Sequence, residues 1–329
     1  MAWPAAETSQ RHQWEVTPVR LTDHERNAQC LSAANLQLGL TQFHKNGIAI
    51  IENAVAHSSL DHIRGRMLKD LPRNLASPEV HYNHGKTHRN VSQTPPLLAE
   101  YLHEDIWANR VAVTFMEHII GPKPQLSFAT SNIALPGGQG RQAVHSDYYC
   151  EHHNFPVVLE VCIFLDAVDR NNGSTEIWPG THHGYTKEHH TFADMGWIKK
   201  NVFEKRAQIC PPIQPVIPKG SLCVRDLRMW HAGMPNHTVI PRIMLGFIFS
   251  PAWFASRMRL KLPEAARAIA KSWNHVEVLC DAESAKDDMD YLNFAQEMNL
   301  TQEERDWEGK YVSKHGCISA GPDDYWEPA

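Results

Sequence analysis

The stretch Arg141-Gln142-Ala143-Val144-His145-Ser146-Asp147 places an imidazole and a carboxylate two positions apart, just after a glycine-rich break in the chain. In an extended segment, residues i and i+2 project from the same face, so His145 and Asp147 could bind one metal ion from the same side. An iron(II) site of the two-histidine, one-carboxylate kind also needs a second histidine and must keep its other coordination positions open. The rest of the chain would have to supply that histidine.

The His-x-Asp pattern is weak evidence by itself. With 21 histidines and 37 acidic residues among 329 positions, about two His-x-acid pairs are expected by chance. The chain contains another such pair, His103 and Asp105, inside a stretch that reads as helix. On a helix, residues i and i+2 point about 200° apart, so these two side chains could not easily share a metal. We therefore set the second pair aside.

The motif lies inside a region whose composition is typical of β-structure. Between Gln125 and Phe254, short runs rich in β-forming residues are separated by glycine, proline and asparagine turns. The expected strands are 126–135, 157–168, 176–178, 207–217, 221–225 and 243–249. This pattern predicts a fold that is mainly β with flanking helices, in which the strands form a sandwich or barrel.

The flanking segments are predominantly helical in pattern. Apolar residues at helical spacing predict a helix that ends at Asn46-Gly47, a second that ends before Leu71-Pro72, and a long one over 97–120. A buried strand is expected at 48–51. After Pro263 we expect helices at 265–273 and 287–298 and a further segment opened by Thr301.

Residues 72–96 break these patterns. They are rich in proline and asparagine and carry His81, His84 and His88, and loops of this length usually serve as lids or binding segments. We expect a lid over a pocket here. A metal clamp formed by His84 and His88 on one helical turn is the weaker alternative, because Gly85 lies between them.

The chain is expected to form one domain over residues 1–329. Its parts are an N-terminal arm (1–30), a helical and lid elaboration (31–122), the β core (123–255) and a C-terminal helical extension (256–329). The amphipathic C-terminal helices and the aromatic tail could cover the lid of a second copy, so a homodimer is possible.

Composition excludes several classes of function. A net charge of −5 with 32 basic and 37 acidic residues well mixed gives no basic stripe for nucleic acid. The sequence shows neither a basic start followed by an apolar run nor a stretch of about 18 apolar residues, so we expect a soluble cytoplasmic protein without a membrane partner. Its seven scattered cysteines include no Cys-x-x-Cys, which predicts reduced thiols.

The strongest candidate for the second histidine is His231, which follows the predicted strand 221–225. Eleven residues further on, Arg242 begins the apolar strand 243–249, where its guanidinium would point among hydrophobic neighbours. A buried arginine needs an anion. A dicarboxylate co-substrate that chelates iron through its keto acid end would bring that anion as its far carboxylate. A metal site and an anion site are thus explained together.

Four segments in this order resemble the phytanoyl-CoA dioxygenase family over about residues 36–255. They are Gln142-x-x-His145-x-Asp147, Asn172-Gly173-Ser174-Thr175 with Pro179-Gly180-Thr181-His182, Trp230-His231-Ala232-Gly233, and Pro241-Arg242. The resemblance implies a double-stranded β-helix (jelly-roll or cupin-like barrel) core and an oxygenase that depends on Fe(II), 2-oxoglutarate and O2.

The same resemblance implies roles for individual residues. His145, Asp147 and His231 would be the iron ligands, and Arg242 would bind the distal carboxylate of 2-oxoglutarate. Further co-substrate contacts would come from Gln142 and Thr175, although Thr175 could equally be a simple turn residue. Halogenase-like members replace the aspartate with a small residue, so the presence of Asp147 favours oxygenation.

The substrate is expected to be an apolar small molecule. Aromatic residues flank the motifs and could line an apolar pocket, although on barrel strands such residues more often belong to the core. They are Tyr148, Tyr149, Trp230, Phe247, Phe249 and Trp253. No clustered basic site for the phosphates of an acyl-CoA is visible, so a secondary-metabolite tailoring oxygenase is favoured over a phytanoyl-CoA-type hydroxylase.

Several readings stay open at the level of sequence. Hydroxylation of an unactivated C–H bond is the default, but desaturation, rearrangement and endoperoxide formation begin from the same chemistry. A cupin-like metal enzyme that does not use 2-oxoglutarate would share the ligands, and Arg242 discriminates against it. A catalytically inactive partner subunit is the alternative outside enzymes.

Overall fold

The computed structural model describes residues 15–148, 155–192, 195–281, 285–293 and 298–300. Its main element is an eight-stranded sheet with the strand order β1-β2-β9-β5-β11-β4-β12, and β3 also pairs with β4. These strands are β1 (Val19–Arg20), β2 (Ile48–Glu52), β3 (Asn90–Ser92), β4 (Gln125–Ala134), β5 (Leu159–Phe164), β9 (Leu222–Asp226), β11 (Arg242–Ser250) and β12 (Glu277–Val278). Two short sheets accompany it, β6 (Glu176–Ile177) with β10 (His231–Ala232), and β7 (His190–Phe192) with β8 (Met195–Ile198).

The chain winds back and forth between the main sheet and the short β6–β10 sheet. After β4 in the main sheet, His145 forms an antiparallel bridge to His231 of β10. The chain then returns to the main sheet as β5, crosses to β6, returns as β9, crosses to β10 and returns as β11. This alternation between two facing sheets is the winding of a double-stranded β-helix, and the predicted fold class is confirmed.

Side chains on the central strands alternate between two environments, as the period of two in a strand requires. One side faces a cavity and includes Glu160, Cys162 and Phe164 of β5, Cys223 and Arg225 of β9, and Met244, Gly246 and Ile248 of β11. The other side belongs to the main hydrophobic core and includes Val161, Ile163, Leu222, Val224, Leu245, Phe247 and Phe249. The sheet therefore separates a packed core from a cavity.

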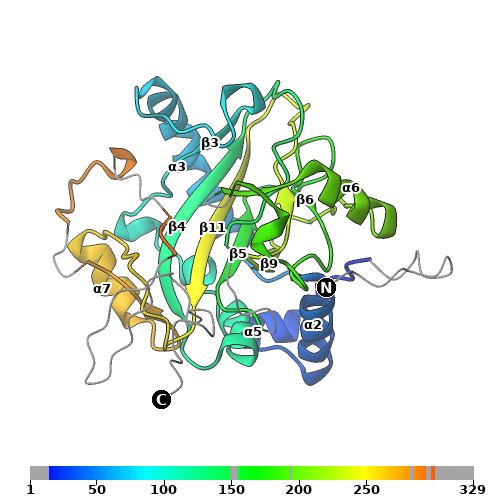
Figure 1. Cartoon of the computed structure of the whole chain (residues 1–329). Helices are drawn as coiled ribbons and strands as arrows, with labels where there is room; N and C mark the ends of the chain where they lie inside the picture. The colour runs from blue at the N-terminus through cyan, green and yellow to red at the C-terminus, as the bar shows by residue number, and fades with distance from the viewer. Residues whose placement is uncertain (1–14, 149–154, 193–194, 282–284, 294–297, 301–329) are drawn as a thin grey trace, which may run out of the picture.

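Helices cover the core side of the main sheet. In Figure 1, β4, β11, β5 and β9 lie side by side across the middle of the molecule, with α2 and α5 below them. Helices α2 (Ala33–Asn46), α3 (His57–Ala76) and α5 (Arg110–Ile120) each contribute fully buried residues to this core, among them Phe43, Met67 and Phe115. The remaining helices are α1 (Asp23–Ala28), α4 (Glu104–Trp107), α6 (Lys200–Ile209) and α7 (Glu264–Ser272).

The predicted strands are confirmed with one exception. The run 207–217 was expected to be a strand, but α6 continues to Ile209. Pro211 and Pro212 then end the helix, because proline lacks the backbone N–H that a further turn needs. Beyond them the chain forms only isolated bridges, at Ile213 and Ile217.

Two predictions for the first third of the chain are wrong, and the predicted N-terminal arm has structure of its own. The long helix over 97–120 is divided into a 3-10 turn (Ala99–Tyr101), α4 and α5, because the Asn109 side chain caps α5 and restarts the helix. Helix α3 continues through Pro72 to Ala76, and burial of Leu71 against the core offsets the lost hydrogen bond. The N-terminal arm contains β1, which pairs in parallel with β2, and the capped helix α1.

The C-terminal predictions are met in part. Helix α7 lies where a helix was expected. Within 287–298, the described residues form turns and the 3-10 helix Tyr291–Asn293 in place of an α-helix. The segment from Thr301 lies outside the described residues. Within the part of the chain that the structure describes, no helix is long and apolar enough to cross a bilayer.

A buried histidine below the α2–β2 turn makes the stability of the fold depend on pH. Gly47 ends α2 at a φ of +83°, and a Cβ there would come within 2.7 Å of Nδ1 of His182. The other ring nitrogen of His182 lies 3.1 Å from the carbonyl oxygen of His44. Burial lowers the pKa of His182 from 6.5 to about 3, so the folded protein holds this ring neutral.

We expect the free energy of unfolding to fall as the pH drops below about 6.5, because only the unfolded chain then takes up a proton at His182. The loss from this group is about 2 kcal/mol between pH 7 and pH 5, from ~1.4 kcal/mol per pH unit. Denaturant unfolding of the wild-type protein and of His182→Gln at both pH values measures it. Equal pH dependence in the two proteins would contradict the assignment.

Candidate metal centre

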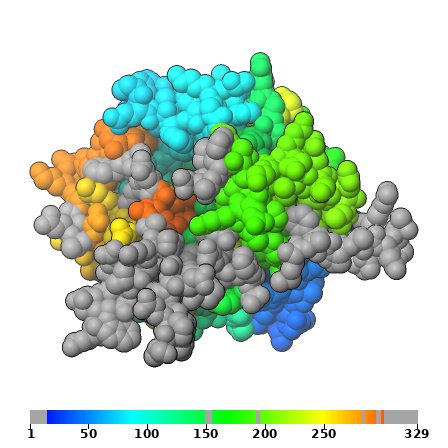
Figure 2. All heavy atoms as spheres, in the orientation of Figure 1, coloured from blue at the N-terminus to red at the C-terminus, as the bar shows by residue number. Residues whose placement is uncertain are grey.

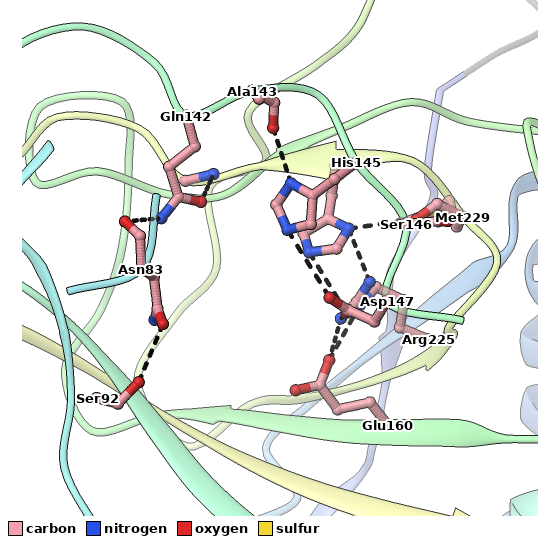
Figure 3. A network of polar contacts seen from close by, with 12 residues as sticks. Asn83, Ser92, Gln142, Ala143, His145, Ser146, Asp147, Glu160, Arg225 and Met229 are labelled. Carbon is pink, nitrogen blue, oxygen red and sulfur yellow. Dashed lines mark hydrogen bonds and ion pairs between the residues drawn. The ribbon is translucent and has the colours of Figure 1, made fainter. Parts of the chain in front are cut away.

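The side chains of His145 and Asp147 meet that of His231, which is distant in the sequence, at the mouth of the β-helix. Figure 3 shows His145 and Asp147 side by side. His145 lies between β4 and β5, Asp147 follows two residues later, and His231 is the first residue of β10. The backbones of His145 and His231 exchange two hydrogen bonds, N to O distances of 3.0 and 2.8 Å. Their candidate ligand atoms all lie within 4.8 Å of one another, and no other such group of three occurs among the described residues.

Backbone contacts orient the two imidazoles toward Asp147. Nδ1 of His145 lies 2.8 Å from the carbonyl oxygen of Ala143, and Nδ1 of His231 lies 3.3 Å from that of Met229. An Nδ1–H that donates to a carbonyl leaves Nε2 free to bind a metal. Nε2 of His145 is 3.7 Å from Oδ1 of Asp147, and Nε2 of His231 is 3.5 Å from Oδ2.

Burial and neighbouring charges set the protonation states that metal binding needs. Burial lowers the pKa of both His145 and His231, so both rings are neutral at pH 7. Burial alone would raise the pKa of Asp147, but His231 and Arg225 outweigh it and hold the pKa well below its usual range. Two neutral imidazole nitrogens and one carboxylate form a donor set that fits Fe(II).

A buried arginine beside the three candidate ligands was missed in the sequence. Nη2 of Arg225, on β9, donates to Oδ2 of Asp147 at 2.6 Å, and Nη1 lies 2.9 Å from Nδ1 of His231. Its Nε donates to Oε2 of Glu160 on β5 at 3.1 Å, and Nη2 contacts the same oxygen. Figure 3 shows Arg225 between the two carboxylates. A signal was present, because both charged residues interrupt apolar strand runs.

The metal centre opens into a cavity of about 760 Å³. One wall is the cavity side of β4, β5, β9 and β11. The opposite wall includes residues of the loop between α3 and β3, residues 77–89, among them Glu79, His81 and His84. In the space-filling view, the cyan segment that contains this loop forms the top of the molecule (Figure 2). The predicted lid segment 72–96 therefore does border a pocket. Its loop is shorter than expected, residues 77–89, because α3 extends to Ala76 and β3 begins at Asn90.

His84 lies against the metal centre without belonging to the ligand group. Its ring centroid is 4.3 Å from that of His145 and 5.6 Å from that of Trp197, and its backbone adopts a left-handed φ of 60°. Burial lowers the pKa of His84 to about 3. Because His84 and Gly85 both have positive φ, His84 and His88 do not lie on one helical turn, and the expected metal clamp is not formed there.

Arg242 lies on the cavity-facing side of β11, in register with Met244 and Gly246. The residue is 2% exposed, and its side chain donates to the carbonyl oxygens of Asn132 (3.2 Å) and Gly173 (2.9 Å). Nε of Arg242 is buried and has no hydrogen-bond partner among the described residues. Burial lowers the pKa of Arg242 to about 10, so it is still a cation at pH 7. Arg242 lies directly behind the cavity wall, which includes Asn132 and Phe164.

Gln142 and Thr175 occupy different surroundings. Oε1 of Gln142 accepts from the backbone N–H of Gly233 at 2.8 Å, and Nε2 donates to the carbonyl oxygen of Asn83 at 3.4 Å. Gln142 therefore joins the α3–β3 loop to the segment after β10, while part of it lines the cavity. Thr175 also lines the cavity, two residues after the carbonyl group of Gly173 that binds Arg242.

The predicted aromatic pocket residues that the structure describes are not in the cavity wall. Phe247 and Phe249 lie on the core side of β11, Trp230 and Tyr148 are buried in two smaller clusters, and Trp253 is 46% exposed. Tyr149 lies outside the described residues. Strand parity explains the error on β11, because odd-numbered positions there face away from the side that carries Arg242. The cavity wall instead includes the aromatic residues Phe128, Phe164 and Trp197.

Known proteins that resemble this chain include one protein family and two structures of one enzyme. The family described as Phytanoyl-CoA dioxygenase (PhyH) matches residues 43–244, more than half of this chain. The crystal structure of the non-heme alpha ketoglutarate dependent epimerase SnoN from nogalamycin biosynthesis is 14% identical with a TM-score of 0.49, covering 67% of this chain and 85% of that chain. SnoN in complex with Fe3+, alpha ketoglutarate and nogalamycin RO has the same TM-score and coverage at 15% identity.

Proposed function

The chain belongs to the phytanoyl-CoA dioxygenase family, a family of Fe(II)- and 2-oxoglutarate-dependent oxygenases, and from that premise we propose that His145, Asp147 and His231 bind the iron. The observation that carries the proposal is the convergence of these three donors, two neutral and one anionic, at one end of a cavity. Three protein ligands leave the remaining coordination positions open for co-substrate and O2.

Arg242 and Thr175 are the residues we assign to 2-oxoglutarate. A guanidinium has five N–H groups, and only two of those on Arg242 have partners among the described residues. A buried cation with unused donors is suited to a carboxylate, which a planar guanidinium can bind through two hydrogen bonds. This spare capacity favours a 2-oxoglutarate enzyme over a cupin-like enzyme that uses the same metal ligands alone. Gln142 would act by holding the α3–β3 loop against the site.

The bound iron and 2-oxoglutarate would supply the oxidising chemistry, in which 2-oxoglutarate and O2 give succinate and CO2 while a C–H bond of the substrate is oxidised. The chain's own residues position the reactants and exclude water. The α3–β3 loop and the cavity side of the main sheet enclose the site from opposite directions. Hydroxylation is the reaction we propose first.

The cavity supports a substrate of moderate size with both apolar and hydrogen-bonding groups. Its volume of about 760 Å³ lies within the range of drug-sized ligand sites. Apolar side chains such as Phe128 and Trp197 alternate with polar ones such as Asn74 and Gln93. The described wall contains no lysine, and its one arginine, Arg225, pairs with two carboxylates. We therefore propose a secondary-metabolite tailoring reaction in preference to the oxidation of an acyl-CoA, whose phosphates require cations.

A substrate-free assay tests the proposal. The purified protein is loaded anaerobically with Fe(II), mixed with 2-oxoglutarate and O2, and assayed for succinate. We expect slow, iron-dependent succinate formation that stops when a chelator removes the metal. Absence of both metal binding and succinate would support the alternative of an inactive partner subunit. A screen for small molecules that accelerate the reaction would then identify the substrate.

A further inference from the structure

We propose that Arg225, held by Glu160, is a positioning residue that occupies one carboxylate oxygen of Asp147 and so restricts this side chain to binding the metal through its other oxygen. The proposal rests on the assignment of Asp147 as a metal ligand. Arg225 also touches the edge of His231 that faces away from the candidate metal position. One guanidinium therefore contacts two of the three proposed ligands.

The contacts distinguish the two oxygens of Asp147. Oδ2 accepts from Nη2 of Arg225 at 2.6 Å, a short charge-assisted hydrogen bond. Oδ1 is 3.7 Å from Nε2 of His145 and Oδ2 is 3.5 Å from Nε2 of His231, so both oxygens face the proposed ligands, and only Oδ2 also accepts from Arg225. A carboxylate whose one oxygen is fixed in this way presents the other to a metal and cannot rotate to offer both. The site then keeps one more coordination position open than it would with a bidentate aspartate.

Glu160 makes this arrangement possible in a buried place. The side chains of Arg225 and Glu160 are only 6% and 7% exposed, and that of Asp147 is 21% exposed. A buried guanidinium with too few partners is unstable, because its hydration is lost without replacement. Glu160 accepts from both Nε and Nη2 of Arg225, which fixes the plane of the guanidinium. The remaining nitrogen, Nη1, then lies beside Nδ1 of His231.

The geometry requires the shape of arginine as well as its charge. Nη2 bridges Asp147 and Glu160 and Nε also donates to Glu160, so two nitrogens in one plane serve two carboxylates. A lysine has one nitrogen and cannot reproduce this fork. Strand register explains how the residues meet, because Glu160 of β5 lies directly opposite Arg225 of β9.

The test uses the metal itself, without turnover. Co(II) is titrated anaerobically into the wild-type protein, Arg225→Met, Arg225→Lys and Glu160→Gln in the presence of 2-oxoglutarate, and both the affinity and the visible spectrum of Co(II) are recorded. We expect Arg225→Met to weaken Co(II) binding by roughly 10- to 100-fold, the range for residues that orient metal ligands. Its spectrum should change in intensity, since a freed Oδ2 alters the coordination number. Arg225→Lys should recover part of the affinity and not the wild-type spectrum.

Arg228→Met is the matched control. Arg228 is another buried arginine, three residues along the chain, and it forms its ion pair with Asp226. Its loss should lower stability without changing the spectrum of Co(II). Wild-type affinity and spectrum in folded Arg225→Met would overturn the proposal. If Arg225→Met does not fold, Glu160→Gln takes its place, and wild-type Co(II) affinity and spectrum in that variant would likewise overturn the proposal. Failure of the wild-type protein to bind Co(II) would instead contradict the proposed metal site.

Discussion

Replacing His231 with alanine is expected to abolish iron-dependent conversion of 2-oxoglutarate to succinate. The replacement removes one of three candidate ligands and leaves His145 and Asp147, which are two residues apart on one segment and provide no donor from β10. Changes to residues that merely orient ligands cost about 10- to 100-fold in metal affinity, so loss of a ligand should cost more than about 100-fold. Anaerobic Fe(II) titration and the succinate assay measure both effects.

His237→Ala is the control for this prediction. His237 lies six residues after His231, on the exposed side of the same connection to β11, so its removal changes the histidine content without touching the site. Both variants should unfold at similar denaturant concentrations if His231 serves the metal more than the fold. Wild-type iron affinity in His231→Ala would show that the three side chains are not the metal site.

Much of the fold could be predicted because strand runs in this chain are short, apolar and bounded by proline and glycine. The alternation of side chains between the two faces of a strand predicts more than was drawn from it. Once Arg242 is placed facing inward at the start of β11, Met244 and Gly246 must share its face. Phe247 and Phe249 must face the helices, as they do. The assignment of Phe247 and Phe249 to the pocket failed on strand parity that the sequence already contained.

The charged residues of the site could also have been found in the sequence, because a charged residue in an apolar strand needs a partner of opposite charge. Arg242 was identified because a guanidinium among apolar strand residues needs an anion. Arg225 and Glu160 satisfy the same criterion, since each lies in a run of apolar residues that forms a central strand. They were missed because they neutralise each other, and only the register of β5 against β9 reveals that pairing.

Other features depend on contacts that local sequence does not contain. Pro72 would normally end a helix, yet α3 continues because tertiary packing of Leu71 outweighs the local cost. The stretch 97–120 has the spacing of one helix, but Asn109 caps a new one and donates to the carbonyl oxygen of Ala54. The opposite wall of the cavity comes from the α3–β3 loop, whose position follows from the pairing of β3 with β4.

Replacing Arg242 with alanine is expected to raise the KM for 2-oxoglutarate while leaving the affinity for Fe(II) nearly unchanged. Truncating one partner of a buried, hydrogen-bonded charge pair costs about 2–5 kcal/mol, which is roughly 30-fold or more in binding. The KM of Arg242→Lys should lie between those of the wild type and Arg242→Ala, because lysine keeps the positive charge and loses the planar fork of the guanidinium. Succinate formation as a function of 2-oxoglutarate concentration, at fixed Fe(II), gives KM and kcat for each variant.

The split between KM and kcat separates this role from a structural one. Arg242 also donates to the carbonyl oxygens of Asn132 and Gly173, so its loss will lower stability to some extent. A protein that is only less stable should lose kcat in proportion to its folded fraction, whereas loss of a carboxylate anchor is overcome by saturating 2-oxoglutarate. Arg170→Ala, an exposed arginine on the loop that leads to Gly173, should leave both constants unchanged. An unchanged KM in Arg242→Ala would remove the carboxylate assignment and return the cupin-like alternative to consideration, because the metal ligands alone do not specify 2-oxoglutarate.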